Sequence, residues 1–260
     1  MILVNSYNRI LDRIERIGRA GVFLANGFWC AITPPYLPFS VIKQLHFIGA
    51  RSLFVVVVAG LFVGMVVALQ FYDTLVRFGS IAMLGAAVGL SLIRELGPVL
   101  TALVIIGRAG SAICAEISIM RNEQQIDALE CMAIDPFQYL IAPRLLAALI
   151  SVPLLTVIFI TVGIFGGYFV GVILFDVSPG SYLGGMYDAV IWRDIIMGAS
   201  KSVIFGLLMI WVATAKGFYL HLDTSGAHGS EGVSKITTDA VVLSSIAVLF
   251  ADYLLSAIIL

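Results

Sequence analysis

Five stretches of the chain consist mostly of apolar residues and are long enough to cross a bilayer as helices. A crossing helix needs about 20 such residues. We expect the crossings at 53–72, 81–106, 145–175, 195–215 and 240–260. The pattern therefore predicts an all-α, polytopic membrane protein with about five transmembrane helices in one domain over residues 1–260.

The first 40 residues follow a different pattern. Apolar residues recur at helical spacing from Ile10 to Leu24, and four arginines lie among them: Arg9, Arg13, Arg16 and Arg19. This favours an amphipathic helix in the membrane interface, where anionic lipid attracts basic residues by about 1 kcal/mol each. A helix packed on the surface of the protein itself is the alternative. The proline-rich stretch 33–38 is expected to end this helix before the first crossing.

Composition supports a membrane location. Hydrophobic residues make up 60% of the 260 residues and charged residues 12%, whereas soluble domains average about 45–50% and about 25%. No basic stripe indicates a nucleic-acid partner. Basic residues concentrate on one side of the crossings, which predicts a cytoplasmic N-terminus and a C-terminus on the far side. Arg77, Arg193 and Lys201 are the basic residues expected at the far side.

Glycines recur at four-residue spacing in the expected crossings. The pairs are Gly60 and Gly64, Gly85 and Gly89, Gly163 and Gly167, and Gly167 and Gly171. Such spacing permits close approach of helices in lipid, so we expect a tightly packed bundle.

Arg94 and Glu95 are the charged pair that the sequence places inside a crossing. An ionised residue at the bilayer centre costs about 2.5–3.5 kcal/mol on insertion scales. Such residues usually face the protein interior or a wet cavity. One interpretation is a polar site for a substrate head group. The other is a structural ion pair with another helix, or a helix break near the interface, and the residues alone leave both open.

A polar stretch separates the second and third crossings. Ile126, Leu129 and Ala133 share one helical face, whereas Glu123, Asp127 and Glu130 lie on another face. The stretch predicts a cytoplasmic amphipathic helix over 118–133, which Asp135-Pro136 ends. It could be a solvated loop helix or a docking helix for a cytoplasmic partner.

Several catalytic signatures are missing from the sequence. There is no phosphate-binding GxxxxGK[ST] motif and no HExxH motif. We therefore expect no catalytic residue, metal site or cofactor in this chain. Two other classes remain as alternatives to the membrane-spanning subunit of a transporter that a partner chain drives. One is an ion-coupled carrier in which Glu95 titrates, and the other is a membrane-embedded enzyme that acts on lipids.

An ordered series of motifs resembles the MlaE family. These proteins are the permease subunits of bacterial ABC transporters that move phospholipid between the inner and outer membranes. The similarity covers nearly the whole chain and is strongest over residues 92–144. It is carried by Leu92-Ile93-Arg94-Glu95-Leu96-Gly97-Pro98, Gly107-Arg108-Ala109-Gly110-Ser111, Ala115-Glu116, Asp127-Ala128-Leu129-Glu130, Asp135-Pro136, Pro143-Arg144, Val152-Pro153, Thr237-Thr238 and Asp252.

The resemblance implies a homodimer in the bacterial inner membrane that maintains the lipid asymmetry of the outer membrane. A cytoplasmic ATPase would bind ATP and magnesium and dock on 118–133. A STAS-domain protein and a periplasmic hexamer of MCE-domain subunits would complete the assembly. The implied docking residues are Arg121, Glu123, Gln124, Asp127 and Glu130. Phospholipid would lie between the two permease copies, near Arg94 and Glu95, in a cavity with an outer part lined by Val67, Gln70, Leu75 and Phe78.

Overall fold

The computed structural model describes residues 18–33, 38–220 and 229–259. Within these ranges every regular element is a helix, and five helical segments are long and apolar enough to span a membrane. The segments are Pro38–Arg77, Ile81–Asn122, Phe137–Leu174, Trp192–Phe218 and Gly229–Ile258. The expectation of an all-α protein with five crossings is confirmed.

Each helix extends beyond the range expected from its apolar residues. The first crossing comprises α2 (Pro38–Leu45), the π turn η1 (His46–Ala50) and α3 (Arg51–Arg77). The second comprises η2 (Ile81–Met83), α4 (Leu84–Ser91), η3 (Leu92–Leu96), α5 (Gly97–Ile105), η4 (Ile106–Gly110) and α6 (Ser111–Asn122). The third comprises η5 (Phe137–Ile141), α8 (Ala142–Tyr168) and η6 (Phe169–Leu174). The fourth is α10 (Trp192–Phe218), and the fifth is α11 (Gly229–Ile259).

Tertiary pairing of charged residues explains the extra length. Arg108 lies just beyond the expected end of the second crossing, and its guanidinium donates to the carbonyl of Phe47 and to Ser52 Oγ. Buried Arg144 pairs with Glu116 at 2.9 Å. These partners compensate the charges of both arginines, so the helices can continue where hydropathy alone predicts an end.

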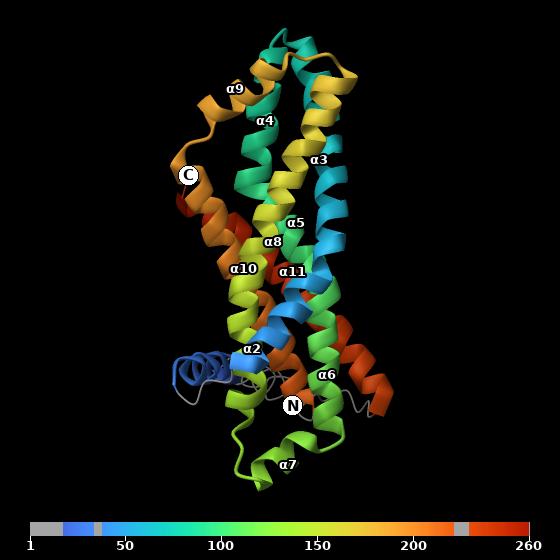
Figure 1. The fold of residues 1–260 in the computed structure, drawn as a ribbon. Coiled ribbons are helices and arrows are strands. Elements are labelled where there is room, and N and C mark those ends of the chain that lie inside the picture. Colours follow the sequence, from blue (N-terminus) through green and yellow to red (C-terminus); the bar gives the residue numbers. More distant parts are fainter. Residues whose placement is uncertain (1–17, 34–37, 221–228, 260) are drawn as a thin grey trace, which may run out of the picture.

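The expected single helix over 118–133 is two helices. Residues 118–122 belong to α6, and a separate helix α7 spans Gln125–Cys131. Gln124 breaks the path with a left-handed backbone (φ 58°). The sequence offered no glycine or proline to mark this break. The helix α7 projects beyond the other helices at one end of the bundle, here called the α7 end (Figure 1).

Glycine packing holds α3 against α8, which confirms the expectation from the glycine spacing. A Cβ on Gly60 would lie 2.8 Å from the carbonyl oxygen of Phe159, and one on Gly64 would overlap the backbone of Gly163. A further helix that the sequence reading did not anticipate, α9 (Pro179–Ala189), packs on α4 in the same way, with the backbone of Tyr182 against Gly85. The backbones approach closely because no side chain separates them.

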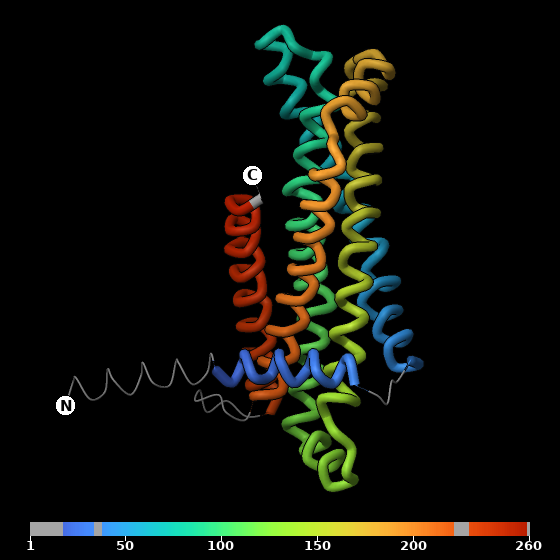
Figure 2. The backbone as a smooth tube through the Cα atoms, turned by 90° about the vertical axis from the view of Figure 1, so that its left-hand side faces the viewer, coloured from blue at the N-terminus to red at the C-terminus, as the bar shows by residue number. Residues whose placement is uncertain are grey.

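A helix over residues 18–32, here called the transverse helix, lies across the bundle near its α7 end (Figure 2). Its Phe23 is buried among Phe137, Phe218 and Tyr219. Its opposite side exposes Val22, Trp29 and Ile32. The helix thus packs on the protein and also presents apolar residues outward, as an interfacial helix does. Arg9, Arg13, Arg16 and the stretch 34–37 lie outside the described residues.

Candidate functional site

Arg94 and Glu95 lie in the π turn η3, inside the second crossing. They do not pair with each other. The Arg94 guanidinium contacts a carboxylate oxygen of Asp194 on α10 at 2.8 Å. The Glu95 carboxylate contacts Lys201 Nζ, also on α10, at 2.6 Å. Both side chains therefore connect the second crossing to the fourth.

Lys201 is the centre of the cluster. Its side chain is fully buried, and its ammonium contacts Asp252 of α11 at 2.8 Å in addition to Glu95. The ammonium also donates to Ser256 Oγ at 2.7 Å and to the Arg94 carbonyl oxygen at 3.1 Å. Ser256 in turn donates to Glu95 at 3.0 Å. One lysine thereby joins three crossings.

The members of this cluster differ in accessibility. Lys201 is 0% exposed and Asp194 is 5% exposed, whereas the side chains of Arg94 and Glu95 are 34% and 39% exposed. The buried groups hold the partly exposed ones in place. The cluster thus combines a structural ion-pair network with accessible polar atoms. The interpretation as ion pairs with another helix is confirmed, and the interpretation as a site for a substrate head group stays a prediction.

The cluster also lies deep within the membrane-spanning part. Trp211 of α10 donates from its indole nitrogen to the carbonyl of Ala20 at 2.9 Å, which fixes the level of the transverse helix. Lys201 lies about 15 Å further along α10, at about 1.5 Å per residue. The hydrocarbon core is about 30 Å thick, so an interfacial position of the transverse helix puts Lys201 near the bilayer middle.

The sequence reading missed Lys201, Asp194, Asp252 and Ser256 as members of this site. The expectation that Lys201 lies at the far side of the membrane is wrong, because its side chain is buried between helices. The signal was available: Lys201 lies within the expected crossing 195–215 and Asp252 within 240–260. A charged residue inside a crossing requires a partner, which is the same argument that singled out Arg94 and Glu95.

The residues expected to line the outer part of a cavity fall into two groups. Val67 is buried in the core and Leu75 is half-buried, whereas Gln70 and Phe78 are exposed. Gln70 and Phe78 therefore offer accessible surface on this chain, and Val67 packs against its own bundle. The portion of the bundle formed by α3, α4 and α8 continues beyond the C-terminal end of α11 (Figure 2).

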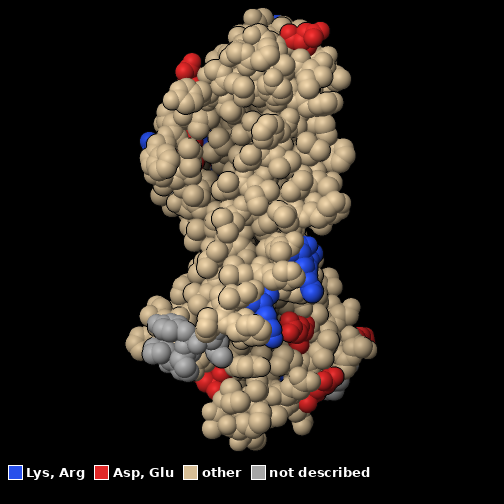
Figure 3. All heavy atoms as spheres, in the orientation of Figure 1, with Lys and Arg blue, Asp and Glu red and all other residues tan. Residues whose placement is uncertain are grey.

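The expected docking residues lie at the α7 end, where most of the charged atoms on this face gather (Figure 3). Glu123, Gln124, Asp127 and Glu130 are exposed, and Ile126 is buried beneath them. Asp127 forms an ion pair with Arg121 at 2.7 Å. Arg121 also lies over the ring of Phe218. Arg121 and Asp127 therefore attach α7 to the bundle, while Glu123 and Glu130 project from it.

These features define a multi-pass α-helical membrane protein with a charged cluster inside its membrane-spanning part. The family description "Permease MlaE" matches residues 41–258. The intermembrane phospholipid transport system permease protein MlaE of Haemophilus influenzae is 43% identical, and the alignment covers 96% of this chain and 94% of that protein. The chain therefore belongs to the MlaE permease family.

Two other relatives extend this finding. A probable ABC transporter permease protein of Rickettsia bellii is 38% identical, with 98% of each chain covered. The chloroplastic protein TRIGALACTOSYLDIACYLGLYCEROL 1 of Arabidopsis thaliana is 33% identical over 84% of this chain and 61% of that protein. The similarity thus extends from bacterial permeases to a chloroplast protein of a plant.

Proposed function

We propose that this chain is the permease subunit of an ABC transporter that moves phospholipid between the inner and outer membranes of a bacterium and so maintains outer-membrane lipid asymmetry. The carrying observation is the cluster of Arg94 and Glu95 with Lys201, in which buried partners hold partly exposed charges inside the membrane-spanning part. A phospholipid has a charged head and long apolar tails. A polar site with apolar walls suits that shape better than it suits a sugar or an ion.

In this proposal Arg94 and Glu95 contact the lipid head group, and Gln70 and Phe78 line the path taken by the tails. Phe78 lies in the turn just before the helical segment that carries Arg94, and that segment rises by about 20 Å from Ile81 to Arg94. This separation is comparable to the length of an extended lipid tail. Two copies of the chain would enclose the pathway, with Val67 and Leu75 supporting its wall from behind.

The proposed assembly places the α7 end and the N-terminus in the cytoplasm and the C-terminus in the periplasm of an inner-membrane complex. A separate ATPase, which binds ATP and magnesium, docks on the exposed acidic face of α7. A STAS-domain subunit binds that ATPase, and a periplasmic hexamer of MCE-domain subunits sits above the permease. Movement of α7 would reach the lipid site through α6 and α5, because these helices form one continuous segment with η3.

Photo-crosslinking to phospholipid tests the lipid pathway. A photoreactive residue at Gln70 in the assembled complex should capture phospholipid several-fold more efficiently than one at Val157, which is exposed on the surface of α8. Capture of phospholipid at Gln70 should also be lower without ATP than under turnover with ATP. Equal capture at Gln70 and Val157, independent of ATP, contradicts the pathway.

Charge reversal tests the docking surface. Glu123→Lys and Glu130→Lys should release the ATPase from the purified complex, because both residues are exposed, Glu130 on α7 and Glu123 in the turn that precedes it. Glu231→Lys is the matched control, since Glu231 is exposed at the start of α11 near the same end. Asp127 is less suitable because its reversal also breaks the ion pair with Arg121. Retention of the ATPase by both the Glu123→Lys and the Glu130→Lys variant rules out this docking surface.

The two alternative classes have direct tests. An ion-coupled carrier would transport lipid under a membrane potential without any ATPase, and a lipid enzyme would convert phospholipid as the purified chain alone. The proposed permease should do neither. Lipid transport and lipid conversion in reconstituted vesicles, both measured with and without the ATPase subunit, separate all three.

A further inference from the structure

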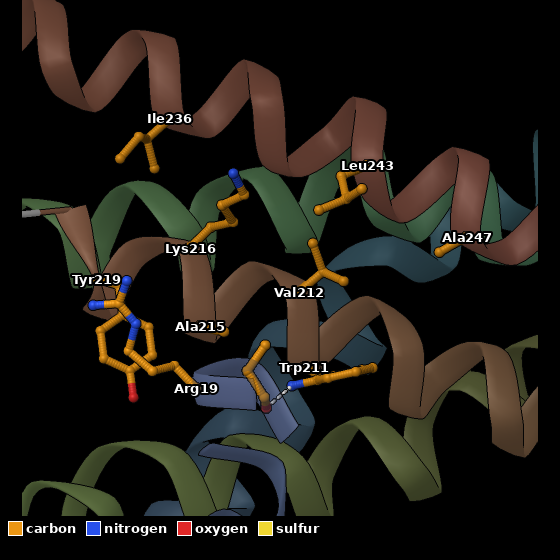
Figure 4. Close-up of a pocket in the computed structure, with 10 residues that line it drawn as sticks. Arg19, Trp211, Val212, Ala215, Lys216, Tyr219, Ile236, Leu243 and Ala247 are labelled. Atoms are coloured by element: carbon orange, nitrogen blue, oxygen red, sulfur yellow. Dashed lines mark hydrogen bonds between the residues drawn. The ribbon is translucent and has the colours of Figure 1, made fainter. Parts of the chain in front are cut away.

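A hollow lies at the other end of α10 from the charged cluster, between the transverse helix, α10 and α11 (Figure 4). Its volume is about 330 Å³, within the usual range for small-ligand sites. The Trp211 to Ala20 hydrogen bond closes one wall. The lining residues are Arg19, Ala20, Trp211, Val212, Ala215, Lys216, Tyr219, Ile236, Leu243 and Ala247.

The hollow is polar at one end and apolar at the other. Arg19 and Tyr219 lie at one end, and Leu243 and Ala247 lie toward the other end (Figure 4). Lys216 points across the hollow toward α11 near Ile236. From Ile236 to Ala247 the helix α11 rises by about 16 Å. The hollow therefore runs from cationic groups at the α7 end into the apolar part of the bundle.

The charge and shape together select one class of ligand. Among the described residues that line the hollow, two are cationic and none is acidic. Basic pockets between membrane helices at the level of the lipid head groups favour anionic lipids, by about 1 kcal/mol per basic residue. The transverse helix exposes apolar residues outward, as expected at that level. An anion without an apolar tail would leave the wall formed by Val212, Leu243 and Ala247 without contacts.

We propose that this hollow binds an anionic phospholipid from the leaflet at the α7 end, with its phosphate beside Lys216 and Arg19 and one acyl chain along Val212, Leu243 and Ala247. The site is separate from the transport cluster, because Lys216 lies roughly 20 Å along α10 from Lys201. The lipid joins the transverse helix to α10 and α11. Only the assignment of this leaflet to the cytoplasmic side depends on the proposed function.

Native mass spectrometry of the full-length protein tests the site. The protein is exchanged into detergent containing equal amounts of phosphatidylglycerol and phosphatidylcholine, and the retained lipids are counted. The unchanged protein should retain phosphatidylglycerol preferentially. Lys216→Gln should reduce this preference about fivefold, since one basic contact is worth about 1 kcal/mol. Ala247→Trp should reduce binding of both lipids by filling the apolar end.

Lys235→Gln is the matched control, because Lys235 is exposed on α11 and does not line the hollow. It should leave the preference unchanged. Equal preference in Lys216→Gln and the control overturns the proposal. Displacement of the retained lipid by millimolar inorganic phosphate would indicate a simple anion site and also overturn it. If the Ala247→Trp variant no longer shows the mass of a dimer but retains as much lipid as the unchanged protein, the hollow is a contact between two copies of the chain and the proposal is overturned.

The outcome is independent of the transport pathway. None of these substitutions touches the cluster around Lys201 or the wall at Gln70. If Lys216→Gln leaves the phosphatidylglycerol preference unchanged while crosslinking at Gln70 is normal, the lipid site in the hollow alone is rejected. If Lys216→Gln lowers the preference but no phospholipid is captured at Gln70, the transport pathway is rejected and the lipid site in the hollow stands.

Discussion

Two helix pairs in this bundle are held together by different physical means. Between α3 and α8 the contact is made by backbone, because glycines let the main chains meet at Gly60 and Gly64. The helix α11 is attached differently. In its most apolar stretch only 11% of the residues are buried, compared with 50% in the corresponding stretch of α10. Its connection to the second and fourth crossings includes the ion pair between Asp252 and Lys201 and the hydrogen bonds of Ser256.

The difference shows how helices associate in lipid, where apolar surface gives no drive of the kind it gives in water. Association then depends on close packing or on polar contacts. The α3–α8 pair uses packing, and α11 adds buried charge. Backbone packing of this kind allows one arrangement of the two helices, whereas the charges of an ion-pair network can exchange partners with a charged ligand such as the proposed lipid head group. The charged interface is therefore the one suited to a changing site.

The largest effect is expected from Lys201→Met. The substitution leaves Glu95 and Asp252 without their cation inside the bundle. Breaking a buried ion pair by removing one partner costs roughly 3–5 kcal/mol. Unfolding in mixed micelles should report this loss, and Lys235→Met on the exposed side of α11 should show almost none. The triple variant with Glu95→Gln and Asp252→Asn should recover much of the stability. A mild effect of Lys201→Met alone would mean that the network does not hold α11.

A smaller effect is expected from Gly64→Ala. The added methyl group overlaps the backbone of Gly163, so α3 and α8 must separate. Overpacking of this kind costs about 1–3 kcal/mol. Gly107→Ala provides the control, because nothing lies within 4 Å of its Cβ position. The same unfolding measurement should place Gly64→Ala between Lys201→Met and the control. If both glycine variants are equally stable, the backbone contact does not stabilise the α3–α8 pair.

The sequence predicted the packed interface well and the charged one poorly. Apolar length revealed the crossings, and the spacing of Gly60 and Gly64 revealed close packing, because both signals are local. The partners of Arg94 and Glu95 lie about 100 residues or more away in sequence. Their pairing depends on how three helices are arranged, which no local pattern encodes. The break at Gln124 was missed for a related reason, since the tertiary anchors of Ile126 and Arg121 outweigh the cost of a left-handed glutamine.

The smallest effect is expected from Ser256→Ala, and it separates the network from the helix that carries it. The Ser256 hydroxyl accepts from Lys201 and contacts Glu95, so its removal should cost about 1 kcal/mol, the typical contribution of one hydrogen bond. Ser245→Ala is the matched control, because Ser245 lies on the same helix and its hydroxyl bonds to the carbonyl of Val241. Unfolding should therefore distinguish the two alanine variants by most of that amount. Equal stability would mean that the ion pair with Asp252 provides the whole polar attachment of α11, and that Ser256 only fills the space beside it.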